Sequence, residues 1–169
     1  AISELIFASE NENSTLNNKE IHVSKIESLE DSFVNFNPSH FDDPKIINIL
    51  KNVNKKSLNM RGFGDTYGYH LVATGRADVM FEMGPKAWDI SAYQIIIKQA
   101  GGRYSDFDGN GYALGGTSLA TNGLVHEEML QWEIKEGKRI IYDDGHFIAF
   151  CPFVSKTPYE IRIFPKKFN

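Results

Sequence analysis

The chain has 169 residues, a length that suits one domain, or one domain with a small appendage, and is too short for two full domains. Its formal net charge of −4 provides no general basic field, so we expect neither nucleic acid nor an anionic membrane surface as a partner. The single cysteine, Cys151, excludes an internal disulfide and a cysteine-based zinc site.

No stretch of the sequence predicts membrane insertion or export. Every apolar run is shorter than a bilayer-spanning helix, and the opening "AISELIFASENENS" lacks the basic region and long apolar core of a signal peptide. We therefore expect a cytoplasmic protein.

The first third of the sequence predicts short strands followed by a helix. Residues 4–36 indicate strands broken by polar turns, with "NENSTLNN" (11–18) as a loop and "KEIHVS" (19–24) as an edge strand. "FDDPKIINILKNVNKK" (41–56) predicts a helix, because an aspartate can cap it, Pro44 suits the first turn and isoleucine and leucine recur on one face.

From residue 57 onward, strands and helices alternate. This alternation is typical of an α/β layer architecture, which is the fold class that we predict. The expected strands lie within 57–62, 77–83, 101–112 and 117–122, and the expected helices within 65–75, 88–102 and 123–136.

The last forty residues have a different character. "KRIIYDDGHFIAFCPF" (138–153) predicts a β-hairpin with its turn at Asp144 and Gly145, and "YEIRIFPKK" (159–167) predicts one further strand. Since a lone hairpin is marginal in water, these strands need a partner. We expect them either to extend the preceding sheet or to pair with a second copy of the chain, which would give a homo-oligomer.

Asp89 opens the helix "WDISAYQIIIKQAGG" (88–102), and two roles are open to it. The free amides and the positive end of the helix dipole favour a carboxylate at this position with or without a metal. On the residues of this segment alone, helix capping is favoured over metal binding.

A longer segment changes the balance between capping and metal binding for Asp89. This segment covers residues 61–111 and reads "RGFGDTYGYHLVATGRADVMFEMGPKAWDISAYQIIIKQAGGRYSDFDGNG". It resembles the second half of the inositol monophosphatase family, and "GDTYGY" with "ATGRADVMFE" is most similar to the histidinol-phosphatase branch. The resemblance extends upstream through residues 4–34 and downstream through "TSLATNGLVHEEML", so that it covers about residues 1–131. It implies an α/β layered sheet with helices like those of that half of the family fold.

The resemblance also implies Mg²⁺-dependent hydrolysis of a phosphate monoester carried by a small metabolite. By position in the family motifs, Asp89 is implied as a metal ligand and Glu82, seven residues earlier, as a contact to substrate hydroxyl or amine groups. Asp65 is implied as a residue that recognises a cationic amino-alcohol substrate. Hard carboxylate oxygens suit Mg²⁺, which keeps water and substrate phosphate as its other ligands.

Each of these residues also has a structural interpretation. Glu82 can be an exposed residue after a strand, and Asp65 can cap the helix that follows it. Asp106 and Asp108 in "SDFDGNG" fail the calcium-loop spacing and indicate a turn. The remaining candidates, His70 and His126, are expected on a helix surface or in the core.

The family's first half supplies a glutamate and an Asp-Pro-x-Asp-Gly-Thr loop, and this sequence contains neither. One carboxylate cannot hold catalytic magnesium, so we expect a weak or vacant Mg²⁺ site, no catalytic residue and no activity of the chain by itself. The alternative is a non-catalytic domain that binds a phosphorylated metabolite or assembles with a partner.

Residues 133–169 resemble a segment of galactose-1-phosphate uridylyltransferase, which implies a histidine-triad-like hairpin and returning strand. The nucleophilic His-Pro-His motif of that family is not in the sequence, so a hexose-1-phosphate uridylyltransferase remnant ranks third among the functions, and a simple β-hairpin is preferred. We thus expect an inositol-monophosphatase-like part at 1–131 and a β appendage at 132–169, joined as a fusion or chimera.

Overall fold

The computed structural model describes residues 3–37, 44–64, 66–111, 115–130, 140–144, 146–150 and 161–165. The chain divides into two compact units, Ala1–His126 and Glu127–Asn169. The predicted division after residue 131 stays a prediction, because residues 131–139 lie outside the described ranges. Within those ranges, no helix has the length and apolar character that crossing a membrane requires.

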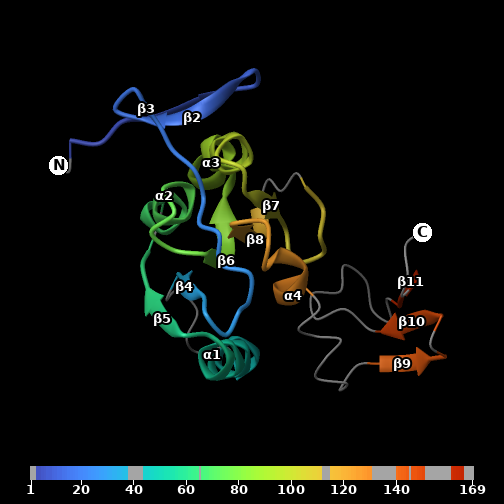
Figure 1. Ribbon diagram of the computed structural model, residues 1–169. Coiled ribbons are helices and arrows are strands. Elements are labelled where there is room, and N and C mark those ends of the chain that lie inside the picture. Colours follow the sequence, from blue (N-terminus) through green and yellow to red (C-terminus); the bar gives the residue numbers. More distant parts are fainter. Residues whose placement is uncertain are drawn as a thin grey trace. The chain divides into compact units, whose positions relative to one another are not determined.

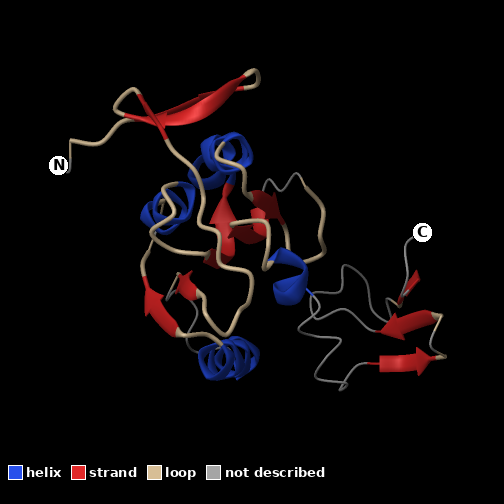
Figure 2. Ribbon diagram, viewed as in Figure 1, coloured by secondary structure: helices blue, strands red, loops and turns tan. Residues whose placement is uncertain are grey.

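A five-stranded sheet forms the centre of the first unit, with the strand order β5-β4-β6-β8-β7 (Figures 1 and 2). β4 pairs in parallel with β5 and β6, whereas β8 is antiparallel to both β6 and β7. The strands are β4 Phe33–Phe36, β5 Asn59–Gly62, β6 Val79–Lys86, β7 Arg103–Ser105 and β8 Gly115–Thr121.

Helices cover both faces of this sheet. α2 (Tyr67–Ala73) and α3 (Ala87–Gln99) pack on β6 and β8 around a shared apolar core, and Figure 1 shows α1 (Pro44–Lys56) on the other side of the sheet. α4 (His126–Leu130) follows β8, and the rest of the helix predicted through residue 136 lies outside the described residues. The predicted α/β layered architecture is confirmed.

A small antiparallel sheet precedes the central one and packs on α3. Its strands are β1 Ile6–Ser9, β2 Glu12–Leu16 and β3 Lys19–Glu20. The prediction of a loop over residues 11–18 is therefore wrong. Asn17 and Asn18 form the turn between β2 and β3, with φ values of 51° and 64° that asparagine tolerates, and this turn lets the polar segment before it pair as β2.

The carboxyl-terminal unit holds a second small sheet. β9 (Ile140–Asp143), β10 (Phe147–Phe150) and β11 (Arg162–Pro165) pair antiparallel in the order β11-β10-β9, which confirms the predicted hairpin and returning strand. The Asp144 carboxylate accepts the backbone N–H groups of His146 and Phe147 at 2.8 and 2.7 Å, while Gly145 lies outside the described residues.

Among the described residues these strands form a sheet of their own, so the first of the two alternatives, extension of the central sheet, is wrong. β11 gives the hairpin the third strand that it needs. Pairing with a second copy stays a prediction.

His126 is a core residue, which confirms one of the two positions expected for it. Its ring is fully buried, with Nε2 2.9 Å from the Ser105 hydroxyl and Nδ1 2.9 Å from the Thr121 hydroxyl. Burial and, to a smaller extent, the nearby Arg103 charge together lower the pKa of His126 to about 3. The imidazole is thus neutral at physiological pH.

This histidine should make the stability of the fold depend on pH. Between pH 6.5, the ordinary pKa, and about 3, the unfolded chain binds a proton that the folded chain excludes, so the free energy of unfolding falls as pH is lowered through that window. We expect a loss of at most about 1.4 kcal/mol per pH unit from this residue. Urea unfolding of the wild type and His126→Gln at pH 5 and 7.5 measures it, with the exposed His22→Gln as control. Equal pH dependence in the wild type and His126→Gln would contradict the assignment.

Gly102 lies where the chain leaves α3 for β7, in a position too close-packed for a side chain. A Cβ there would lie 2.5 Å from the Thr121 carbonyl oxygen and 2.9 Å from Val23 Cγ1. We expect Gly102→Ala to lower the free energy of unfolding by about 1–3 kcal/mol, because a backbone atom must move. Gly111→Ala, whose Cβ meets nothing within 4 Å, is the control for the same denaturation measurement. Equal stability of the two variants would contradict this packing.

Candidate functional site

The candidate site lies at the carboxyl ends of the parallel strands, where α/β sheets usually bind their ligands. Phe36 of β4 is opposite Phe81 of β6, so the next residues, Asn37 and Glu82, are neighbours across the strands. The Asn37 backbone N–H also donates to the Phe81 carbonyl at 3.3 Å. The pairing register of β4 with β6 therefore places the Glu82 side chain next to Asn37, at the carboxyl end of β4.

Four polar side chains form what we call the Glu82 cluster: Asn37, Tyr69, Glu82 and Ser118. The Tyr69 hydroxyl donates to Glu82 Oε2 at 2.9 Å, and the Asn37 carboxamide donates to Oε1. Because the single hydroxyl proton of Tyr69 is used on Glu82, the Ser118 hydroxyl donates to Tyr69, at 2.6 Å. Both carboxylate oxygens of Glu82 are thus held by neutral donors.

Glu82 lies within β6 and is only 6% exposed. The interpretation of Glu82 as an exposed residue after a strand is therefore wrong. A carboxylate that is buried in this way requires hydrogen-bond donors, and those donors fix its direction. The proposed contact between Glu82 and a substrate stays a prediction.

Tyr69 comes from α2 and, like Ser118, is fully buried. Burial raises the pKa of its phenol, and the negative charge of Glu82 raises it further. The hydroxyl therefore keeps its proton at every physiological pH. Tyr69 is a permanent hydrogen-bond donor to Glu82 rather than an acid or a base.

Asp89 occupies the first turn of α3, three residues after the N-cap residue Lys86. Its Oδ2 accepts the Lys86 backbone N–H at 3.0 Å, which satisfies one of the free amides at the helix start. The capping interpretation is confirmed. Its other oxygen hydrogen-bonds to no protein atom in the described ranges, so one oxygen is available for a cation, and metal binding by Asp89 stays a prediction.

Asp65 lies outside the described residues. The N-cap position of α2 is Thr66, whose side chain makes no capping hydrogen bond. Neither the recognition role nor the capping role of Asp65 is tested, and both stay predictions.

The "SDFDGNG" segment is a turn, as predicted. Asp106 Oδ1 accepts the backbone N–H groups of Asp108 and Asn110 at 2.9 and 2.8 Å, and Oδ2 accepts the Asn110 carboxamide at 2.8 Å. This local pattern is a typical aspartate-centred turn and explains the aspartate without a calcium ion.

The described residues do not fit a complete magnesium site. Over the ranges given above, no group of three or more histidine, cysteine, aspartate or glutamate side chains is placed to hold a metal ion. Magnesium takes several oxygen ligands in octahedral geometry, and Asp89 supplies one oxygen. We therefore derive no chemical step through a metal from these residues.

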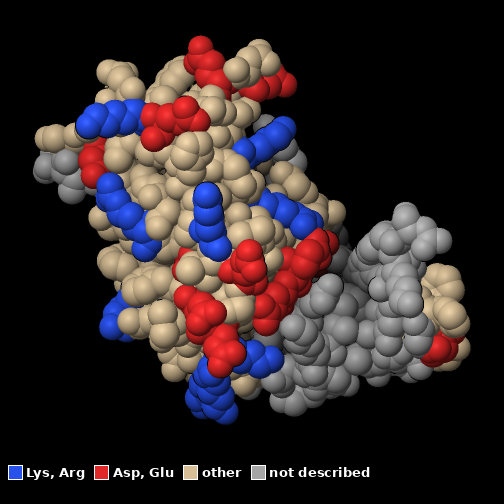
Figure 3. Space-filling view, in the orientation of Figure 1, with Lys and Arg blue, Asp and Glu red and all other residues tan. Residues whose placement is uncertain are grey.

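Charge on the visible surface is mixed. Figure 3 shows acidic and basic side chains interspersed over the face that it draws. A protein that binds nucleic acid through its phosphates usually gathers Lys and Arg on one face. The expected absence of a nucleic-acid partner stays a prediction.

Three members of the Glu82 cluster were not identified from the sequence: Asn37, Tyr69 and Ser118. Tyr69 and Ser118 lie 13 and 49 positions from their partners Glu82 and Tyr69, so no local motif links them. The available signal was weak: a tyrosine in a helix that packs on the strand carrying Glu82 is placed to pair with a buried carboxylate.

Comparison with known proteins gives a consistent match. The model of the inositol monophosphatase family matches residues 1–140. A histidinol-phosphatase of Streptomyces coelicolor is 31% identical over 65% of this chain and 42% of its own length. One of Mycobacterium tuberculosis is 42% identical over 42% of this chain and 27% of its own.

The fold agrees with these sequence matches. The structure of a Thermotoga maritima IMPase superposes with a TM-score of 0.71 and 28% identity, over 80% of this chain and 54% of that protein. The chain thus spans about half or less of the length of these relatives.

The hydrogen bond from Tyr69 to Glu82 should be measurable as stability. Tyr69→Phe removes one donor from a buried carboxylate, and we expect the free energy of unfolding to fall by about 1–3 kcal/mol. Tyr93→Phe is the matched control, because the Tyr93 ring stacks on Tyr69 at 5.5 Å but its hydroxyl hydrogen-bonds to no described residue. Chemical denaturation should show a change below about 0.5 kcal/mol for Tyr93→Phe. Equal losses in both variants would mean that the Tyr69 hydroxyl contributes nothing specific.

Proposed function

Because the chain belongs to the inositol monophosphatase family, we propose that it carries the substrate side of a Mg²⁺-dependent phosphomonoesterase site, of the histidinol-phosphatase type. The relatives named histidinol-phosphatases support the choice of branch. The single observation that carries the proposal is the Glu82 cluster, a carboxylate held by its donors at the carboxyl ends of the parallel strands.

In this proposal, Glu82 receives hydroxyl or ammonium groups of the substrate. Asn37 and Tyr69 fix the orientation of its carboxylate, so that the substrate is positioned without rearrangement of the protein. Asp65 contributes a second negative charge toward a cationic amino-alcohol. The substrate itself is a small phosphorylated metabolite.

Asp89 is proposed as one ligand of magnesium. In phosphatases, bound magnesium polarises the phosphoryl group and lowers the pKa of a bound water. The 169 residues contain no Asp-Pro-x-Asp-Gly-Thr loop, and the described residues offer one carboxylate oxygen at this position. We therefore propose that the chain by itself binds magnesium weakly and does not hydrolyse phosphate esters.

The alternative is a non-catalytic domain that binds a phosphorylated metabolite or assembles with a partner, and the missing loop is the observation in its favour. Nucleotidyl transfer remains the third hypothesis. It rests only on the resemblance of residues 133–169 and has no support from the comparisons, in which the family match extends to residue 140. A cytoplasmic location and self-association through the carboxyl-terminal strands are likewise proposals, based on the sequence alone.

Titration calorimetry with Mg²⁺, with and without inorganic phosphate, tests the proposed role of Asp89. We expect dissociation constants no tighter than about 1 mM, because one carboxylate makes a weak site. Asp89→Asn should abolish the binding heat, since asparagine keeps the capping acceptor but loses the charge. Asp31→Asn is the control, because Asp31 is exposed and lies just before the amino-terminal end of β4, whereas the candidate site lies at the carboxyl end.

Two outcomes would overturn the proposal. Binding that survives Asp89→Asn would show that magnesium is held elsewhere. Turnover of histidinol phosphate by the wild-type chain alone would show that its ligand set is complete.

A further inference from the structure

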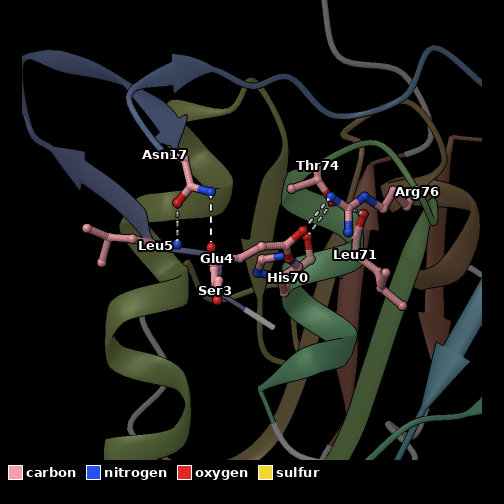
Figure 4. A network of polar contacts seen from close by, with 8 residues as sticks. All are labelled: Ser3, Glu4, Leu5, Asn17, His70, Leu71, Thr74 and Arg76. Carbon is pink, nitrogen blue, oxygen red and sulfur yellow. Dashed lines mark hydrogen bonds and ion pairs between the residues drawn. The ribbon is translucent and has the colours of Figure 1, made fainter. Parts of the chain in front are cut away.

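Glu4 connects the amino-terminal sheet to α2. Its Oε2 lies 2.6 Å from His70 Nε2, and its Oε1 accepts Arg76 at 3.1 Å (Figure 4). Oε2 and Nε2 are both shielded from solvent, and in the described ranges neither has a hydrogen-bond partner of regular geometry, so each faces the other as its polar neighbour. Hydrogen bonding from Arg76 holds the pKa of the Glu4 carboxyl below its usual range, so the carboxylate is ionised at neutral pH. The contact with His70 connects Glu4 to α2, and the ion pair with Arg76 connects it to the segment that follows the helix.

The backbone on both sides of Glu4 is held by one asparagine of the small sheet. Asn17 Oδ1 accepts the Leu5 N–H at 2.9 Å, and Asn17 Nδ2 donates to the Ser3 carbonyl at 3.1 Å. The Asn17 backbone N–H also donates to the Leu5 carbonyl at 2.9 Å. The position of Glu4 is therefore determined by the β2–β3 turn rather than by its own side chain.

The same small sheet also holds α3. The Ser14 hydroxyl donates to the Ile96 carbonyl at 2.7 Å, and the Gln99 carboxamide donates to the Glu10 carbonyl at 2.7 Å. The small sheet thus contacts α3, which carries Asp89, while Glu4, just before β1, contacts α2, which carries Tyr69.

α2 depends on such contacts for its position. It is seven residues long and has no side-chain cap at its start, and so short a helix is not stable by itself in water. His70, which Glu4 holds, is the residue after Tyr69 in this helix. A shift of α2 at His70 would move the Tyr69 hydroxyl relative to Glu82.

We propose that Glu4 is a positioning residue for the Glu82 cluster: through His70 and Arg76 it fixes α2 so that Tyr69 stays hydrogen-bonded to Glu82. The functional meaning of this inference rests on the proposed role of the cluster in binding substrate. Its physical content is an energetic coupling between the Glu4 and Glu82 ends of α2, which can be measured without any ligand.

A double-mutant cycle on the full chain tests the coupling. Glu4→Gln removes the charge with little change of shape, and we expect it to raise the unfolding equilibrium constant by about tenfold. In the double variant Glu4→Gln/Tyr69→Phe, the effect on the unfolding equilibrium constant should differ by more than about threefold from the product of the two single effects, because the two contacts depend on each other. Segment-resolved hydrogen exchange should show about tenfold faster exchange over residues 67–76 in Glu4→Gln.

Two controls separate this coupling from a general loss of stability. Glu20→Gln removes the exposed Glu20–His22 pair from the same part of the chain, at 3.3 Å, and should leave exchange in α2 unchanged. Glu4→Gln with Tyr93→Phe should be multiplicative within about twofold, because the Tyr93 hydroxyl is not part of the Glu82 cluster.

The inference would be overturned if the effects of Glu4→Gln and Tyr69→Phe on the unfolding equilibrium constant were multiplicative and hydrogen exchange over residues 67–76 were unchanged. Glu4 would then be a residue with a local structural role only. This result is distinguishable from failure of the proposed function. The cycle uses no magnesium or phosphate, whereas the calorimetric titration does not involve Glu4.

Discussion

A buried carboxylate in the central strand constrains much of this fold. Glu82 lies in β6, between the parallel strand β4 and the antiparallel strand β8. A buried carboxylate in that position requires hydrogen-bond donors, and these must come from neighbouring strands or from the helix that covers the sheet. Tyr69 can reach it only if α2 lies close to β6. Gly68 permits this approach, because a Cβ there would stand 2.3 Å from the Met80 sulfur. The polar contact and the close packing of helix on strand therefore require each other.

The two sides of the proposed site share one uninterrupted piece of chain. β6 ends at Lys86 and α3 begins at Ala87, so no loop separates the strand that carries Glu82 from the helix that carries Asp89. Their separation is set by the irregular end of β6, where the register with β8 shifts between Met83 and Lys86 and Gly84 has a φ of 71°, and by the first turn of α3. Asp89 also strengthens this junction, because its carboxylate caps the helix that it opens.

Sequence patterns predicted the alternating elements well, since apolar periodicity and glycine stops are local properties. They failed at residues 11–18, where a polar composition suggested a loop although Ser14 is buried by its hydrogen bond to α3, 82 positions away. Of the four members of the Glu82 cluster, only Glu82 was identified from the sequence, for the same reason: the other three come from distant segments. Asp89 was assigned to the right place, and a capping hydrogen bond to an amide three residues earlier is the kind of local contact that a sequence can indicate.

The contacts of the small sheet with α3 have a consequence for how the chain is made. Ser14 and Gln99 each bond across the two elements, over sequence separations of 82 and 89 residues. At a synthesis rate of 5–20 residues per second, β1 and β2 leave the ribosome roughly 4–16 s before α3 is available. During that interval Ile6 and Ala8, which pack against the core in the finished fold, lack the part of that core that α3 supplies. The nascent chain therefore passes through a stage in which its first strands are exposed to chaperones and to other chains.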